Sequence, residues 1–325
     1  MSSYLPAAAS ASVDPSVLAW ALLGTGVAVM LAVDLFVFGR GDHEVTVKEA
    51  GAWSAVWLAV AIGFGGLMWA YGGSDAGSEY LAGYLLERSL SLDNVFVFAV
   101  LFGYFAVPAI VQPRVLSWGI ALALVLRLVF ILLGAALLDA FHVTFYLFGA
   151  LLIYTAWKLA HHDDTDVEPE HNPALRFLRR RLPMAKDYDG NRLSTHQGGR
   201  RIATPLVAVF VVVATTDVIF AIDSIPAIFA ITTVPFIVFA ANAFAMLGLR
   251  ALYFLLVGVM DRFVYLSQGL AVVLGVIGVK MLLIDVWHVP VWLSLGLIVV
   301  ILGATAVLSL RAQPSGERGE ESQLA

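Results

Sequence analysis

The sequence has no cysteine and few charged residues. Without cysteine the chain forms neither disulfides nor thiolate metal sites, so any metal chemistry has to use oxygen or imidazole ligands. Only 13% of its 325 residues are charged, whereas 60% are hydrophobic and the mean hydropathy is +0.88. This composition lies outside the range of soluble domains. It excludes zinc-finger and thioredoxin-like proteins, argues against nucleic acid as a partner, and indicates that the chain's surroundings are a lipid bilayer.

Apolar stretches of about the length of a membrane-spanning helix recur nine times along the chain. A helix needs about 20 mostly apolar residues to cross a hydrocarbon core of roughly 30 Å. The predicted fold class is therefore an all-α polytopic membrane protein, with residues 1–325 as one membrane domain. The predicted spans lie near Val17–Phe38, Ala50–Tyr71, Leu81–Phe105, Val115–Leu138, Val143–Lys158, Pro205–Ala230, Pro235–Val257, Phe263–Ile284 and Val291–Leu310.

Basic residues are sorted to one side of this nine-span arrangement. Those of the predicted loops, including the eight between Arg176 and Arg201, all fall on the same side. Because cytoplasmic loops carry Lys and Arg in excess, this pattern predicts an outside N-terminus. It also predicts that the polar loop 159–204 and the C-terminal tail 311–325 are cytoplasmic, in a multi-pass protein of the inner (plasma) membrane.

Two predicted spans contain acidic residues in the same layout. The third reads ERSLSLDNVFVF and the sixth reads TTDVIFAIDSIPAIF, each with an acid, five residues, an aspartate, and then an amide or hydroxyl. A charged side chain at a helix centre costs roughly 2.5 to 3.5 kcal/mol on insertion scales, so these acids must face a partner, water or an ion. The candidate metal ligands are Glu87, Asp93 and Asn94 in one segment and Asp217, Asp223 and Ser224 in the other.

The similarity extends to the helices that follow. LRLVFILLG around Arg127 matches LRALYFLLVG around Arg250. The chain therefore contains a predicted three-helix repeat, over residues 81–158 and 205–284. In the nine-span arrangement its two copies have opposite orientations in the membrane. Inverted repeats of this kind are typical of secondary transporters, which bind their substrate near the midplane between the repeats.

The two acids within each segment cannot chelate one ion together on a straight helix. Six positions separate them by about 9 Å along the axis and by roughly 120° around it. Pro226 follows Asp223 closely and removes a backbone donor, so a kink or break is expected beside that carboxylate. Convergence requires such a break or help from the opposite repeat. The oxygen ligands suit hard ions such as Mg²⁺, Ca²⁺ or Mn²⁺.

A structural interpretation of the same acids stands beside the transport one. Arg127 and Arg250 can each pair with a carboxylate, which would make the acids ion-pair glue between helices. Three further residues are candidates for a supporting role. Ser91 lies on the acidic face of the third span, Asp34 lies near the inner end of the first, and Asn242 lies mid-span in the seventh. Hydration explains Asp34 equally well, and interhelical hydrogen bonding explains Asn242.

The polar loop begins with HHDDTDVEPEH at His161 and continues into an Arg-rich stretch. A His/Asp/Glu cluster can collect cations. The simpler interpretation is a hydrated connector whose arginines hold it to the anionic inner leaflet. The Arg-rich stretch is also a candidate docking surface for a cytoplasmic partner.

The two acidic segments, ERSLSLDNVFVF and DVIFAIDSIPAI, have a loop between them that contains NPALRFLRRRLP, and the chain returns into the membrane at ATPL. In these motifs the sequence resembles the TerC family of integral membrane proteins. The resemblance covers nearly the whole chain and is closest to the long-loop, Alx-like branch, within the wider LysE-type exporter group. It implies divalent metal export, with Mn²⁺ favoured, and the family takes its name from tellurium resistance. A plastid branch is associated with thylakoid membrane biogenesis instead.

Three functional hypotheses follow. The first is a cation exporter that takes Mn²⁺ as substrate, holds no prosthetic group, and exchanges the ion for protons, since the sequence has no ATP-binding motif. The second is a non-transporting membrane component of a tellurite, envelope-stress or membrane-biogenesis complex. The third, an intramembrane aspartyl protease, is disfavoured because the GxGD sequence is missing. We therefore expect no enzyme activity and assign no catalytic residue.

Overall fold

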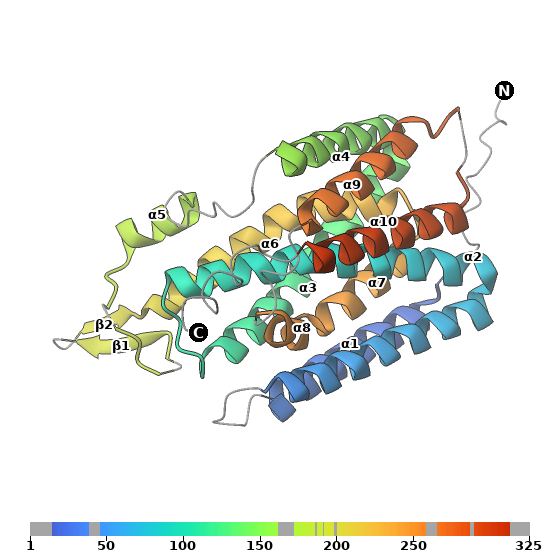
Figure 1. Ribbon diagram of the computed structural model, residues 1–325. Coiled ribbons are helices and arrows are strands. Elements are labelled where there is room, and N and C mark those ends of the chain that lie inside the picture. The colour runs from blue at the N-terminus through green and yellow to red at the C-terminus, as the bar shows by residue number, and fades with distance from the viewer. Residues whose placement is uncertain are drawn as a thin grey trace, which may run out of the picture.

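The computed structural model is a bundle of helices with one small β-hairpin at its edge (Figure 1). The residues it describes are 15–38, 46–161, 172–185, 187–190, 192–197, 200–257, 265–286 and 289–312. The helices are α1 (Val17–Phe38), α2 (Val47–Tyr104), α3 (Gln112–Ala140), α4 (Val143–His161), α5 (Pro173–Arg181), α6 (Pro205–Phe229), α7 (Pro235–Leu247), α8 (Leu249–Leu256), α9 (Leu266–Leu282) and α10 (Val291–Arg311). The strands are β1 (Ser194–Gln197) and β2 (Arg200–Ala203).

Six of the described helices are long and apolar enough to cross a membrane, and α7 with α8 adds a seventh if that bent pair is one span. The six are α1, α2, α3, α4, α6 and α10. The predicted all-α polytopic membrane fold is thereby confirmed. Each of the nine predicted stretches overlaps a helix, but α9 has only 17 residues and α2 covers two stretches at once. The number of nine spans stays a prediction.

α2 is a helical hairpin although its 58 residues are nominally one helix. A straight helix of that length would extend about 87 Å, far more than a bilayer. The chain turns back at Gly73, whose φ of 81° and ψ of −179° lie in a region essentially reserved for glycine. The two arms pack against each other, since the Tyr80 hydroxyl donates to the Ala61 carbonyl at 3.1 Å. Figure 1 shows the chain reversing at the end of the first arm, so that the two arms run in opposite directions.

The seventh predicted span is bent rather than straight. α7 and α8 meet at Gly248 with an angle of 41° between them. The Arg88 guanidinium of α2 donates to the Ala245 carbonyl in the last turn of α7 at 3.1 Å, and it fills the space beside Gly248. The break expected at Pro226 is not found, because α6 is one continuous helix. Only one turn follows Pro226, so little helix remains to be deflected.

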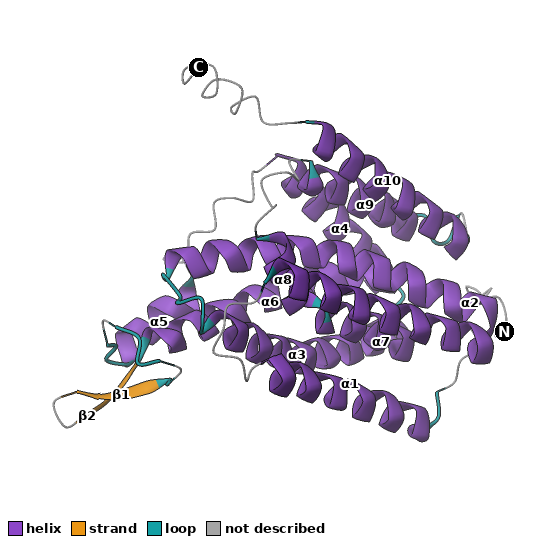
Figure 2. Ribbon diagram, turned by 60° about the horizontal axis from the view of Figure 1, so that its bottom comes forward, coloured by secondary structure: helices purple, strands orange, loops and turns teal. Residues whose placement is uncertain are grey.

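α7 lies at the centre of the bundle and is buried from Phe236 to Leu247. It packs against α2, α3 and α1. α4, α9 and α10 cover the opposite side of the bundle from α1 in both views (Figure 2). α4 and α9 cross so closely that a Cβ on Gly278 would lie 3.0 Å from the Gly149 carbonyl oxygen. Small residues therefore set this crossing, as they do in other membrane helix pairs.

The polar loop 159–204 contains α5 and the antiparallel hairpin β1–β2, in which Ser194 faces Ala203. The Asn172 side chain caps α5 by accepting from the amides of the first turn, and it donates to the Thr215 hydroxyl of α6 at 2.8 Å. The cluster predicted over residues 161–171 lies outside the described residues except for its first histidine. Most of the predicted tail, from residue 313, lies outside them as well.

Candidate ion site in the bundle centre

A buried arginine joins the two acidic helices. Arg127 of α3 donates from Nη1 to Glu87 Oε2 of α2 at 2.8 Å, and from Nη2 to Asp217 Oδ1 of α6 at 3.4 Å. Nη1 also donates to the Ser224 hydroxyl at 3.2 Å. All four side chains are at most 3% exposed. Asp217 and Ser224 are seven positions apart, which puts them on one face of α6, two turns from each other.

Each of these two acids keeps one oxygen that Arg127 does not engage. Glu87 Oε1 and Asp217 Oδ2 are buried and have no hydrogen-bond partner among the described residues. The same holds for the Ser91 hydroxyl, one turn along α2 from Glu87. A buried polar group left unsatisfied costs roughly 1 to 3 kcal/mol, and more when it is charged. These three oxygens therefore have the capacity to accept a proton or coordinate a cation.

The charge of this cluster is not balanced by the arginine alone. With both acids ionised, Glu87 and Asp217 carry two negative charges against the single positive charge of Arg127. A net negative charge buried among helices attracts a cation or a proton. Oxygen donors of the carboxylate and hydroxyl type prefer hard ions.

Asp223, the second acid of the α6 segment, has a different hydrogen-bond partner from Asp217. Asp223 is half-buried and accepts a hydrogen bond from the Thr155 hydroxyl of α4 at 3.0 Å. Asp93 lies in α2, but its side chain is outside the described residues. Asn94, beside it, is buried. The six-residue spacing thus separates Asp217 from Asp223 as expected.

Arg250 belongs to a second buried cluster. Its Nη2 lies 3.3 Å from Asp34 Oδ1 of α1, and its Nη1 donates to the Ser117 hydroxyl of α3 at 2.9 Å. Both arginines that the sequence singled out are therefore paired with carboxylates, but with different sets. Asn242 is fully buried on α7, and neither of its amide atoms has a hydrogen-bond partner among the described residues.

No group of three or more His, Asp or Glu side chains converges within the part of the chain that the structure describes. Among the described residues the site is thus an acid pair bridged by a guanidinium, without a preformed cage of carboxylates. A cation that binds there has to share or displace the contacts of Arg127.

Sequence reasoning missed one buried acid. Glu79 of α2 is 1% exposed and accepts a hydrogen bond from the Thr232 hydroxyl in the turn between α6 and α7. Glu79 precedes Leu81, the residue at which the sequence predicts that the third span begins. Glu79 lies eight residues before Glu87, which places the two acids about 12 Å apart along one helix, and this spacing was the signal that could have identified it. On α9, the Lys280 ammonium is partly buried and donates to Ser294 of α10 at 2.9 Å.

Comparison with known proteins adds context to this geometry. The profile of the "Integral membrane protein TerC family" matches residues 72–317, a range that includes both acidic segments. The "Putative membrane-bound redox modulator Alx" of Escherichia coli strain K12 is 46% identical over 268 residues, which cover 79% of this chain and 83% of that protein. An uncharacterized membrane protein of Myxococcus xanthus is 46% identical over 255 residues, covering 78% of this chain and 80% of its own. No solved structure matches the chain.

Proposed function

Because the chain belongs to the TerC family of integral membrane proteins, we propose that it exports a divalent cation, with Mn²⁺ as the preferred substrate, in exchange for protons. The observation that carries this proposal is the buried cluster of Glu87, Arg127 and Asp217. It brings the first acids of the two repeat-related segments to one guanidinium. The acids of an exporter's empty site have to be neutralised inside the membrane, and an arginine or a proton can do this.

In the proposed cycle Arg127 balances one of the two acids when no metal is bound, and a proton on the other acid brings the cluster close to neutral. A divalent cation entering from the cytoplasm takes over carboxylate contacts from the arginine, with Asp93, Asn94, Asp223 and Ser224 as further oxygen ligands. Release on the outer side leaves the acids to take up protons or to pair again with Arg127. The proton gradient then resets the site, which requires no ATP-binding motif and no catalytic chemistry.

An inverted repeat forms part of the proposal. Its first copy is the second arm of α2 with α3 and α4, and its second copy is α6 with α7–α8 and α9. Equivalent helices touch in all three cases, since α2 contacts α6, α3 contacts α7, and α4 contacts α9. Two copies related by a pseudo-two-fold axis are expected to pair in this way. The nine-span count then treats the α2 arms as two spans and the α7–α8 pair as one.

We propose the inner membrane as the location, with the N-terminus outside and the long loop inside. The four arginines of α5 are exposed, and they lie in that loop. An excess of exposed basic residues on the cytoplasmic side is what the positive-inside rule expects.

The name of the Escherichia coli relative, a redox modulator, fits this proposal only indirectly. This chain has no cysteine, so thiol–disulfide exchange within it is excluded. An effect on redox state would have to arise through the ion that the protein moves. Manganese is itself redox-active, which makes export of this ion a consistent route.

Transport into proteoliposomes tests the proposal directly. Purified protein is reconstituted with a Mn²⁺-sensitive dye and a pH-sensitive dye inside, and a proton gradient is imposed. The wild type is expected to move Mn²⁺ one way and protons the other, whereas Glu87→Gln and Asp217→Asn each reduce Mn²⁺ flux at least about tenfold. Asp75→Asn is the matched control, because Asp75 is an exposed acid on the same helix as Glu87. A wild type that moves no Mn²⁺ contradicts the proposal.

The alternative is a non-transporting component of a tellurite, envelope-stress or membrane-biogenesis complex. The exposed arginines of α5 favour it, because they offer a surface to a cytoplasmic partner. Deleting residues 161–192 separates the two proposals. Lost tellurite resistance with unchanged Mn²⁺ flux supports the alternative, as does normal cellular Mn²⁺ in a strain carrying Asp93→Asn with Asp223→Asn.

A further inference from the structure

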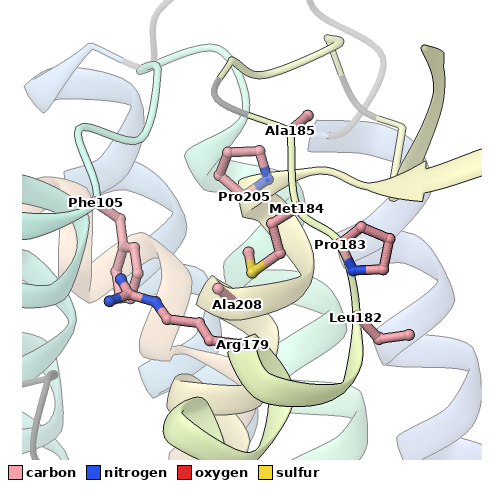
Figure 3. Close-up of a pocket in the computed structure, with 8 residues that line it drawn as sticks. All are labelled: Phe105, Arg179, Leu182, Pro183, Met184, Ala185, Pro205 and Ala208. Atoms are coloured by element: carbon pink, nitrogen blue, oxygen red, sulfur yellow. The ribbon is translucent and has the colours of Figure 1, made fainter. Parts of the chain in front are cut away.

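A pocket lies where the polar loop 159–204 meets the ends of two long helices (Figure 3). Its volume is about 370 Å³, within the range of roughly 300 to 1,000 Å³ that is usual for ligand sites. It is lined by Phe105 just after α2, Arg179 of α5, the segment Leu182–Ala185, and Pro205 and Ala208 of α6. Apart from Arg179 these lining side chains are apolar.

The pocket lies at the ends of two helices that are long and apolar enough to cross a membrane. α2 ends at Tyr104 and α6 begins at Pro205, so both helices end beside the pocket. α5 packs along the first turns of α6 and is anchored by the buried Leu175 and by the bond from Asn172 to Thr215. Since Asn172 lies beside Thr215 and Arg179 lines the same pocket as Ala208, the two helices run antiparallel.

The wall of the pocket is held in place by the loop. The Tyr188 hydroxyl donates to the Phe105 carbonyl at 2.8 Å. Burial raises the pKa of Tyr188 above its ordinary value, so the hydroxyl keeps its proton and remains a donor at neutral pH. Met184 pairs with Ala203 of β2, which ties the same segment to the hairpin.

The charge at the pocket is one-sided. Arg179 has no carboxylate partner among the residues that the structure describes. Arg176, Arg180 and Arg181 of the same helix are also exposed. A guanidinium presents a planar fork of donors that matches the oxygens of a phosphate. An apolar wall beside a phosphate-binding group, at the ends of two candidate membrane spans, matches a phospholipid, which has its phosphate next to apolar chains.

We propose that this pocket binds one anionic phospholipid of the leaflet that it faces, with the phosphate on Arg179 and the glycerol and first methylene groups against the wall formed by Phe105 and Ala208. The neighbouring arginines favour a lipid with net negative charge over a zwitterionic one. The leaflet is the cytoplasmic one if the proposed orientation holds. The site is separate from the Arg127 cluster, and lipid binding needs no metal.

Native mass spectrometry of the full chain in detergent tests the site with two probes, dioleoyl phosphatidylglycerol and dioleoyl phosphatidylcholine. The wild type is expected to retain one phosphatidylglycerol preferentially. Arg179→Gln is expected to weaken that binding roughly tenfold, the effect of one charge-assisted hydrogen bond. Arg179→Lys keeps the charge without the fork and is expected to restore part of the affinity. Arg180→Gln is the matched control, since it removes the same charge from an exposed arginine that does not line the pocket.

Three results would overturn the proposal. An equal loss in Arg180→Gln and Arg179→Gln would mean that the helix attracts anionic lipid diffusely, without a site. Equal retention of both lipids by the wild type would remove the charge preference. Displacement of phosphatidylglycerol by millimolar inorganic phosphate would identify a small-anion site instead. All three measurements omit metal, so they stand apart from any failure of Mn²⁺ transport.

Discussion

Replacing Arg127 with methionine separates ion-pair glue from an ion site. The guanidinium is 1% exposed and contacts Glu87 at 2.8 Å and Asp217 at 3.4 Å. Its removal leaves two carboxylates buried next to each other without a counter-charge. Breaking a buried pair in this way destabilises a protein by about 3 to 5 kcal/mol. We therefore expect Arg127→Met to lower the apparent melting temperature by several degrees.

Two treatments could restore the stability of Arg127→Met, namely added Mn²⁺ and removal of the two acids. Their results distinguish a cation site from ion pairs that only hold the helices together. If the acids bind a cation, Mn²⁺ replaces the missing positive charge, and at 100 times its dissociation constant it restores about 2.7 kcal/mol. The wild type gains less, because Mn²⁺ has to compete with Arg127. The triple variant Glu87→Gln, Arg127→Met, Asp217→Asn removes all three charges, so most of the lost stability returns without metal.

The assay is thermal unfolding followed by tryptophan fluorescence in detergent, with and without MnCl₂. The triple variant is the control for non-specific metal effects, since it lacks the carboxylates and should show no shift with Mn²⁺. The ion-site reasoning is refuted if the triple variant regains stability while Arg127→Met shows no response to Mn²⁺. In that case the acids serve to hold the helices together.

Two further predictions concern α4. Thr155→Val removes the hydroxyl that donates to Asp223 at 3.0 Å. Because the lost hydrogen bond is worth about 1 kcal/mol, we expect the Mn²⁺ concentration for half-maximal flux to rise roughly fivefold. An unchanged flux curve would leave Asp223 outside the transport path. Gly278→Ala would put a Cβ 3.0 Å from the Gly149 carbonyl oxygen, so overpacking should cost about 1 to 3 kcal/mol in thermal unfolding. Gly296→Ala, in open space on α10, is the control and should change stability little.

The helix positions were predictable because the bilayer imposes a simple length and composition on its spans. The pattern of apolar residues does not predict the backbone conformation where two helices meet. Gly73 and Gly248 both lie inside or between apolar stretches, yet the first reverses the chain and the second bends it by 41°. Pro226, the residue with the clearest breaker signal, leaves α6 continuous. Whether a glycine or a proline bends the chain depends on the side chains that pack beside it, as Arg88 packs beside Gly248.

The acids were identifiable from their burial cost, and Arg127 and Arg250 were identifiable as carboxylate partners, but which acid each arginine contacts was not. Arg127 lies 40 residues from Glu87 and 90 from Asp217, so their contact depends on how α2, α3 and α6 pack. The hydrogen bond between Thr155 and Asp223 was not predictable for the same reason, because it depends on how α4 packs against α6. Glu79 was missed for a different reason, because the polar sequence around it obscured the start of the second α2 arm.

The two matched arginines differ in one respect that bears on the proposed mechanism. Arg127 lies between the acids of both proposed repeats, whereas its counterpart Arg250 is engaged by Asp34 of α1, a helix outside the repeats. With two guanidinium groups at the acids, the charges of Glu87 and Asp217 would be fully cancelled and no cation would be attracted. By holding Arg250 elsewhere, α1 leaves the cluster with one negative charge when both acids are ionised. In the proposed mechanism, α1 would thus determine the charge that an incoming cation meets.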